Sequence, residues 1–523
     1  MGTIIKKIRL MNYKRFRDYV LIPNERINIL AGDNEVGKSS ILEAIDIVAG
    51  GNIRRVEMMG IERLLNVDAV NDFMSGERTI DRLPVIRVEL YLLGDFDHTM
   101  NGKNNLDRFT CDGIRLVCEP NRDYSSEIKD MLSANNTCFP YDYYSIRFST
   151  FADEPYTGFK KKLRSVMIDN TRMNSEYATC DFIRRMYYQY TENDKKERSI
   201  HKSLYRQMRT SFKTDSLDLL NSRIPSDKGY MFGLKSITSM DLENDLMIYE
   251  NDVGIDSKGT GKQVFIKTDF ALEKSGDGIE VILIEEPENH LSPVNLRKLI
   301  QKVATTKCGQ LFVSTHSSVI CTRLEINNLL IMHTEGNHPI TLKDLNSNTA
   351  QYFAKTPPAG ILEFVLAQRI ILVEGPAEYM LMERFYESIT DGRKPESEGV
   401  HVVDVRGLSF KRYLDVAKLT GGKVAVITDN DNDYHKHCIE KYNEYCNDDS
   451  IGVFYDTDNA KHTFELQLYA ENSELCDELF GNNAANWMVT PSNKTEAAYT
   501  LLTQDREIVV PDYIKRAINW IRE

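Results

Sequence analysis

Residues Gly32 to Ser39 read GDNEVGKS, which matches the phosphate-binding pattern GxxxxGK[ST] at every fixed position. The strand-like segment RINILAG precedes this loop and the helical pattern SSILEAIDIVAG follows it, as a phosphate loop requires. Glycines let backbone N–H groups surround phosphates, Lys38 adds a point charge near the β and γ phosphates, and Ser39 can bind Mg²⁺. The pattern predicts a nucleotide site formed by Gly32, Asn34, Gly37, Lys38, Ser39 and Ser40.

The length and composition are those of a globular protein with several domains. At about 150 residues per domain, 523 residues predict three or four folding units. Hydrophobic residues make up 41% and charged residues 27%, which excludes a mostly disordered or fibrous chain. The nine cysteines form no CxxC pair, and no stretch approaches the length of an apolar membrane span. We therefore expect a cytoplasmic protein with reduced thiols and with no signal peptide or membrane segment.

Positive charge is concentrated in one part of the chain. The formal net charge is −13, yet residues 159–235 contain 17 Lys and Arg against 9 Asp and Glu. Charged and aromatic residues recur there at helical spacing, and we interpret residues 156–249 as a helical insertion. Its basic face could contact nucleic-acid phosphates, or it could be the solvated face of a dimerisation arm. The basic residues concerned include Lys160, Lys161, Lys162, Arg164, Arg184, Arg185, Arg206 and Arg209.

Two later segments supply acids and a histidine at the ends of apolar strands. VILIEEPENHLSP ends a strand with Glu285 and Glu286, of which the first could hold Mg²⁺ and the second could act as a general base. QLFVSTHSS places His316 after another strand, where it could sense the γ-phosphate. The alternatives are a solvated acidic turn and a histidine satisfied within its own turn. We assign residues 1–155 and 250–356 to the two lobes of one nucleotide-binding domain.

The order of these motifs resembles the ABC-type ATPase heads of the SMC and RecF kind. Such heads carry a signature loop that covers the ATP held by a second protomer. DSKGTGKQ looks like that loop, with Ser257, Gly259 and Gly261 able to present backbone N–H groups, although a flexible surface turn is the alternative. The chain departs from these heads in having no glutamine before Gln189, so the usual link between Mg²⁺ and the insertion is missing.

A second group of acids follows two apolar strands in residues 366–523, beyond the Pro357-Pro358 turn that we take as the domain boundary. RIILVEGPAEYMLM contains two glutamates, and KVAVITDNDND ends with three aspartates. Carboxylates crowd together at strand ends at high cost unless cations neutralise them, and hard oxygen ligands favour Mg²⁺ or Mn²⁺. A solvated helix start and an acidic loop are the alternative. The predicted metal ligands are Glu374, Glu378, Asp429, Asp431 and Asp433.

This arrangement resembles the Toprim fold, and an ABC-type head followed by Toprim resembles the OLD (overcoming lysogenisation defect) family of nucleases. The resemblance implies an α/β chain in which an ATPase head with a helical insertion precedes a Toprim domain. It also implies a further acid, Glu465, as a metal ligand and a lysine, Lys494, that stabilises the transition-state phosphate. The resemblance thus assigns catalysis to Glu374, Glu378, Asp429, Asp431 and Lys494 in one site and to Glu286 and His316 in the other.

The family resemblance implies a nucleotide-regulated DNA endonuclease that uses ATP and Mg²⁺ or Mn²⁺. It further implies a homo-oligomer formed through the heads and the arm, an antiphage role, and a companion such as a helicase or a reverse transcriptase with its noncoding RNA or DNA. Two alternatives stay open at this point. One is a RecF-like DNA-binding ATPase sensor without nuclease activity, and the other is an ATPase that depletes nucleotide.

Overall fold

The chain folds into two compact units, which are described separately. The structure is a computed structural model that describes residues 3–523 except 134–137, 158–162, 170–175, 192–193, 225–230, 233, 235–241, 274–278, 306–308, 334–335, 356–359 and 408–409. Lys160 to Lys162 and the Pro357-Pro358 turn lie outside the described residues. The first unit comprises residues 1–316 and 332–339, and the second comprises residues 317–331 and 340–523. This division is coarser than the four predicted segments, whose boundaries stay predictions.

An antiparallel sheet forms one layer of the first unit. Its strands run in the order β2-β1-β4-β6-β5, with β7 pairing on β6. Inward-facing apolar residues such as Ile8 and Leu10 alternate with more exposed ones along β1, so one face of the sheet is buried. The bounds are β1 (Ile4–Tyr13), β2 (Phe16–Leu21), β4 (Ile86–Leu93), β5 (Asn101–Gly102), β6 (Cys111–Pro120) and β7 (Tyr144–Thr150).

A second, parallel sheet positions the nucleotide motifs. In the first unit its strands run in the order β3 (Ile27–Gly32), β12 (Gln310–Ser314), β11 (Val281–Glu285) and β8 (Ser165–Asp169). All residues of β3, β11 and β12 are buried, as expected for strands covered on both faces. The register aligns Glu285 with Ser314 and Ser314 with Leu30. The carboxyl ends of these strands therefore meet at one edge.

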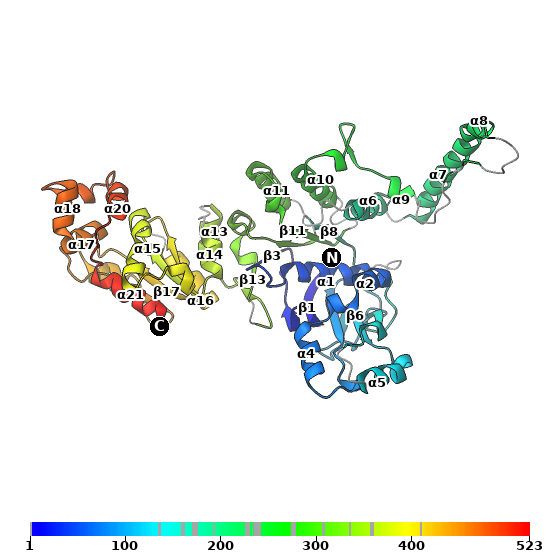
Figure 1. The fold of residues 1–523 in the computed structure, drawn as a ribbon, viewed down its shortest axis with the longest axis horizontal. Coiled ribbons are helices and arrows are strands. Elements are labelled where there is room, and N and C mark those ends of the chain that lie inside the picture. The colour runs from blue at the N-terminus through cyan, green and yellow to red at the C-terminus, as the bar shows by residue number, and fades with distance from the viewer. Residues whose placement is uncertain are drawn as a thin grey trace. The chain divides into compact units, whose positions relative to one another are not determined.

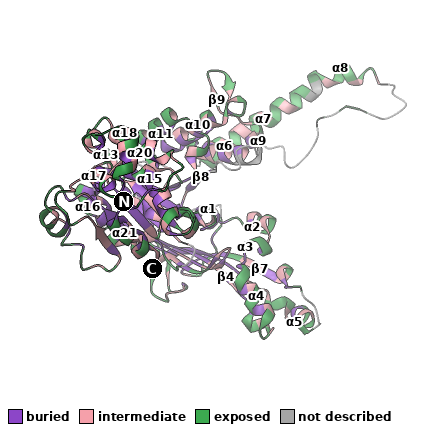
Figure 2. Cartoon of the chain, turned by 60° about the vertical axis from the view of Figure 1, so that its left-hand side comes forward, coloured by how far each residue is buried: buried purple, intermediate pink, exposed green. Residues whose placement is uncertain are grey.

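Helices complete the first unit (Figure 1). The predicted helical insertion, residues 156–249, is wrong in its first part, because β8 is a strand that pairs with β11 in the parallel sheet. The helices α6, α7 and α8 follow β8, and Figure 2 shows exposed and intermediate residues along α7 and α8. The helices and the short hairpin are α1 (Lys38–Gly50), α2 (Ile53–Met59), α3 (Ile61–Leu64), α4 (Val67–Ser75), α5 (Ser125–Ser133), α6 (Glu176–Tyr190), α7 (Lys195–Asp215), α8 (Leu217–Asn221), α9 (Leu242–Asp245), β9 (Tyr249–Glu250), β10 (Val253–Gly254), α10 (Thr260–Glu273) and α11 (Pro293–Thr305).

The second unit is built on a four-stranded parallel sheet. The order is β16 (Val400–Asp404), β15 (Arg369–Val373), β17 (Lys423–Ile427) and β18 (Ile451–Phe454), so β15 and β17, which precede the acids, are neighbours. The remaining elements are α12 (Ser318–Arg323), β13 (Leu329–Met332), β14 (Ile340–Thr341), α13 (Ser347–Lys355), α14 (Ile361–Leu366), α15 (Pro376–Ile389), α16 (Phe410–Thr420), α17 (Phe464–Glu471), α18 (Ser473–Phe480), α19 (Ala484–Val489), α20 (Lys494–Leu502) and α21 (Asp512–Arg522).

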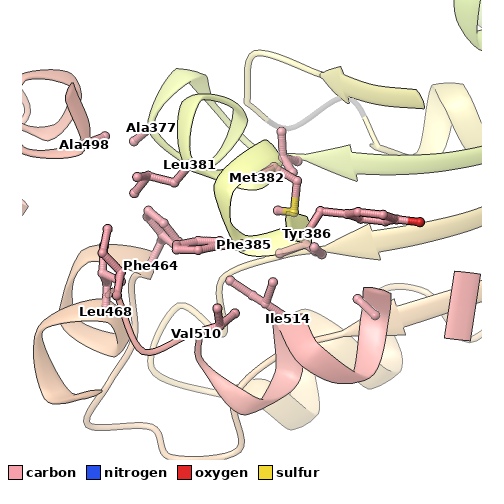
Figure 3. Close-up of a cluster of buried hydrophobic side chains, with 14 of the residues drawn as sticks. Ala377, Leu381, Met382, Phe385, Tyr386, Phe464, Leu468, Ala498, Val510 and Ile514 are labelled. Atoms are coloured by element: carbon pink, nitrogen blue, oxygen red, sulfur yellow. The ribbon is translucent and has the colours of Figure 1, made fainter. Parts of the chain in front are cut away.

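One apolar cluster holds the helices of the second unit on its sheet. Figure 3 shows the buried face of α15, including Leu381 and Phe385, facing Phe464 of α17 and Ile514 of α21. Leu381 and Ile514 are fully buried. Across the described chain, no helix combines the length and apolarity needed to cross a bilayer. Both units join α-helices and β-sheets, and the predicted α/β class is confirmed.

We expect Leu381→Ala to lower the free energy of unfolding of the second unit by about 2–5 kcal/mol, because it removes a buried side chain and leaves a cavity in the cluster. Ser388→Ala is the control, since Ser388 is exposed on the same helix and should change stability by no more than about 0.5 kcal/mol. Urea unfolding of the two variants measures the difference. Equal effects would contradict the role given to this cluster.

Candidate functional site

The phosphate loop lies between β3 and α1, as predicted. Gly37 has a φ of 98°, and a Cβ there would stand 2.5 Å from the Phe16 ring and 2.8 Å from Arg15, so only glycine fits. Lys38 is 5% exposed, and its Nζ donates to the carbonyls of Gly32 and Asp33 at 2.8 Å each. Asn34, Ser39 and Ser40 belong to the loop and the first turn of α1, where Asn34 and Ser39 are exposed.

The acids after β11 lie within electrostatic reach of Lys38. Burial lowers the pKa of Lys38, and the charges of Glu286, Glu288 and Glu285 act against that decrease. Glu285 is buried at the end of its strand. The phosphate loop and the acidic strand end, separated by about half the chain, therefore form one site at the carboxyl edge of the parallel sheet.

The turn that follows β11 joins His316 to the acids. Glu286 has a φ of 40°, its backbone N–H donates to the carbonyl of Ser314 at 3.0 Å, and its carboxylate lies 3.7 Å from Nε2 of His316. Glu288, which the sequence reasoning missed, accepts from the Thr315 hydroxyl at 2.7 Å and from the His316 backbone N–H at 2.6 Å. The third acid of EEPEN was the available signal for this contact.

The predicted signature loop precedes α10. A Cβ on Gly261 would stand 2.1 Å from the carbonyl oxygen of His290, so the start of α10 packs against the turn after β11. Gln263 holds the loop by donating from Nε2 to the carbonyls of Asp256 and Lys258. Ser257 donates to Asp256, and Gly259 stands in open space. The position of this signature loop over the nucleotide of a second copy stays a prediction.

Two arginines of the predicted insertion form ion pairs within the unit, and their contact with phosphates stays a prediction. Arg164 forms an ion pair with Glu280 at 2.6 Å. Arg185 of α6 pairs with Asp46 of α1 at 2.7 Å, and Arg55 of α2 pairs with the same carboxylate at 2.6 Å. Burial alone would raise the pKa of Asp46, but the two guanidinium groups outweigh it and hold the pKa well below its usual value. These side chains hold the unit together.

The acids of the second unit gather at the carboxyl edge of its sheet. Glu374 directly follows β15 and Asp429 lies two residues beyond β17, and these strands pair in parallel with Leu372 opposite Val426. Glu378 stands in the first turn of α15 and Glu465 in the first turn of α17. The two sequence segments are therefore adjacent, as predicted.

These carboxyl groups influence each other strongly. Burial, reinforced by the charges of Glu465 and Glu374, raises the pKa of Glu378 to about 8. Burial and the charges of Glu374, Glu378 and Glu465 raise the pKa of Asp429 well above its usual value. Lys494, the first residue of α20, donates to Glu465 at 2.9 Å. If all these groups were ionised, their negative charge would exceed what Lys494 balances, and the carboxyl groups therefore hold their protons more tightly than usual.

The remaining aspartates of DNDND play different parts. Asp431 is half exposed, at 53%, and lies 4.0 Å from Nδ1 of His437, and its charge adds to the burial that raises the pKa of Glu374. The Asp433 carboxylate instead accepts from the backbone N–H of Lys436 at 3.2 Å, and its role as a ligand stays a prediction. Asn430, which the sequence reasoning missed, is fully buried and donates to the carbonyls of residues 456 and 458.

The donor chemistry of this cluster fits a hard divalent cation, because every acidic group offers carboxylate oxygens and the acids outnumber the lysine that pairs with Glu465. The carboxyl groups lie near one another, but they do not surround a common centre. Among the described residues, no three His, Cys, Asp or Glu side chains are arranged to hold an ion. The residues that would hold cations there are Glu374, Glu378, Asp429 and Glu465.

Comparison with known proteins agrees with this division. Residues 4–244 match the model of the AAA ATPase domain, and residues 365–431 match that of the overcoming lysogenization defect protein-like TOPRIM domain. Over 172 residues the chain is 28% identical to endonuclease GajA of Bacillus cereus (strain VD045). That alignment covers 31% of this chain and 28% of the relative, so less than a third of the relative is matched.

Two solved structures are also similar. The recombination mediator RecF bound to ATP is 10% identical, with 65% of this chain and 99% of that chain covered and a TM-score of 0.35. The C-terminal region of the OLD protein of Xanthomonas campestris pv. campestris is 20% identical, with 30% and 92% covered and a TM-score of 0.23. The chain therefore contains an ATPase domain followed by an OLD-like Toprim domain, an arrangement similar to that of the OLD family.

Proposed function

We propose that this protein is a DNA endonuclease whose cleavage depends on divalent cations and is regulated by nucleotide. The observation that carries the proposal is the convergence of Glu374, Glu378, Asp429 and Glu465, with Lys494, at the carboxyl edge of β15 and β17. The similarity to endonuclease GajA supports the same activity.

The acids and the lysine of the cluster have different roles in the proposed reaction. Divalent cations, when bound, would activate water and offset negative charge on the scissile phosphate. Glu374 and Asp429 meet across paired strands, which gives them a fixed separation. Glu378 and Glu465 are buried and keep the inner side of the cluster acidic. Lys494 keeps its proton, because its carboxylate neighbours outweigh burial and raise its pKa, and it can stabilise charge on the phosphate.

Removal of one carboxylate tests the cleavage site. We expect Asp429→Asn to reduce plasmid cleavage in Mn²⁺ or Mg²⁺ by about 100-fold or more, since losing a few kcal/mol of transition-state stabilisation costs about two powers of ten in rate. The variant should fold, because a neutral amide relieves the repulsion that raises the pKa of Asp429. A gel assay of plasmid nicking measures the effect.

Asp505→Asn is the matched control, since Asp505 is exposed in the same unit and should cleave as the wild type does. A chelator should abolish cleavage by the wild type. If the wild-type chain binds DNA and ATP but cuts nothing with either cation, the alternative of a DNA-binding ATPase sensor replaces the proposal.

The nucleotide site would regulate the nuclease by shifting the population of ATP-bound assemblies, which needs no fast turnover. Lys38 supplies the positive charge of the phosphate loop, and Glu285 and Glu286 stand within its electrostatic reach. In this proposal Glu285 holds Mg²⁺, Glu286 acts as the general base, and His316 beside it senses the γ-phosphate.

Loss of the Lys38 charge should separate nucleotide binding from cleavage. We expect Lys38→Ala to weaken ATP binding by about 10–100-fold, as loss of hydrogen bonds to a charged group implies, and to leave metal-dependent cleavage measurable. Lys298→Ala, an exposed position on α11, should bind normally. Titration with a fluorescent ATP analogue gives both affinities, and unchanged affinity in Lys38→Ala would count against the phosphate loop.

The helical arm offers a surface for self-association. Ile200, Leu204, Met208 and Phe212 are between 50% and 60% exposed, and their four-residue spacing places them in one ridge along α7. The basic residues Lys195, Arg198, Lys202, Arg206 and Arg209 fall on the other side of the helix. Two copies could therefore pair their ridges. On the opposite side Lys202 pairs with Glu243 and Arg198 lies over the Tyr188 ring, and Arg206 remains a candidate for DNA contact.

A charge placed in the ridge tests this pairing. We expect Leu204→Glu to shift the mass measured by light scattering toward the monomer, because association would bury an unpaired carboxylate. Ser203→Glu adds the same charge at an exposed position beside the ridge and should leave the mass unchanged. A wild-type chain that stays monomeric with and without ATP would contradict the arm interface.

The antiphage role and a companion helicase or reverse transcriptase are implied by the family resemblance and stay proposals.

A further inference from the structure

Tyr513, near the start of α21, carries a polar atom that its surroundings leave unused. The side chain is 2% exposed, and its ring belongs to the apolar cluster of the second unit. Its hydroxyl makes no hydrogen bond with any residue in the described part of the chain. A buried hydroxyl without a partner destabilises a fold, whereas phenylalanine would fill the same space without that cost. The hydroxyl therefore calls for an explanation beyond packing.

The direction of α21 brings Tyr513 to the acidic edge of the sheet. The carbonyl of Trp520 accepts from Lys423 at the beginning of β17, and Arg516 donates to the carbonyl of Tyr455, just beyond the end of β18. The helix thus runs antiparallel to these parallel strands. Tyr513 lies about one turn further toward the carboxyl ends, where Asp429 follows β17.

The charges around the hydroxyl are those of the carboxylate cluster. Burial raises the pKa of Tyr513 well above its usual value, and the charges of Asp429, Glu378, Asp456 and Glu465 raise it further, with Asp429 acting most strongly among them. The phenol therefore keeps its proton and can only donate toward these groups or accept from one that is protonated. Tyr442 also carries a buried hydroxyl with no hydrogen bond in the described part of the chain, but the acids whose charges act on it are Glu374 and Asp431 rather than Asp429.

We propose that Tyr513 is a positioning residue of the cation site, whose hydroxyl donates a hydrogen bond to the Asp429 carboxylate once a divalent cation holds that carboxylate ionised. Partners of this kind orient metal-binding side chains and fix their ionised form. The proposal rests on the proposed function, because it needs cations to bind at this cluster. It also explains why the chain retains an unsatisfied hydroxyl: the group is satisfied in the cation-bound state.

The test compares the full-length wild type with Tyr513→Phe and Tyr19→Phe. Tyr19 of β2 is the matched control, because its hydroxyl is likewise buried and has no partner among the described residues, and it belongs to the first unit. Calorimetric titration with Mn²⁺ alone gives cation affinity, thermal unfolding with and without Mn²⁺ gives stability, and plasmid cleavage across a range of Mn²⁺ concentrations gives activity.

We expect Tyr513→Phe to unfold at the same or a higher temperature than the wild type without Mn²⁺, yet to bind Mn²⁺ about 10–100-fold more weakly, as for other partners of metal ligands. Excess Mn²⁺ should restore much of its cleavage. Tyr19→Phe should match the wild type in Mn²⁺ affinity and cleavage.

Three results would overturn the inference: unchanged Mn²⁺ affinity in Tyr513→Phe, an equal loss of affinity in Tyr19→Phe, or a loss of stability without Mn²⁺ large enough to account for the weaker binding. A wild-type chain that binds no Mn²⁺ would instead remove the proposed function on which the inference depends. The failure of the positioning role and the failure of the nuclease are therefore distinguishable.

Discussion

Repulsion between carboxyl groups is the constraint on which the second unit depends. Glu374, Glu378, Asp429 and Glu465 come from four different elements, and all are directed to one edge of one sheet. A fold that accepts this arrangement must supply positive charge or protons, and Lys494 supplies one positive charge through its hydrogen bond to Glu465. The apolar cluster beneath α15 opposes the repulsion, because it fixes the helices that carry Glu378, Glu465 and Lys494.

The first unit uses the same edge of a parallel sheet for a different ligand chemistry. There the backbone of the phosphate loop and Lys38 bring positive charge to the carboxyl ends of the strands, and Glu285 and Glu286 oppose it. In the second unit acids predominate at the corresponding edge. Parallel strands present their carboxyl ends at one edge of a sheet. In the first unit this edge forms a site suited to an anion with a bound cation, and in the second unit it forms a site suited to cations alone.

The sequence alone predicted the site residues that stand at the ends of apolar strands. The phosphate loop, Glu285, Glu374 and Asp429 each end or follow an apolar strand, so their neighbourhood could be predicted from the chain alone. Glu465 and Lys494 were found only through the family resemblance, because they lie on helix starts whose packing no local pattern determines. Asn430, Glu288 and Tyr513 were missed, since their importance lies in partners distant in sequence. The ion pairs of Arg164 and Arg185 could not be predicted for the same reason: a basic residue looks alike in sequence whether it faces solvent or a carboxylate of its own fold.

The ion triad at Asp46 has a mechanical meaning. Asp46 lies on the helix that begins at the phosphate loop, and its carboxylate is held by one arginine from α2 and another from α6, at the root of the insertion. Separating a buried carboxylate from its guanidinium partners costs several kcal/mol. The triad therefore connects α1 to α2 and to the start of α6, so that any displacement of α1 that keeps both ion pairs must be accompanied by a displacement of the start of α6.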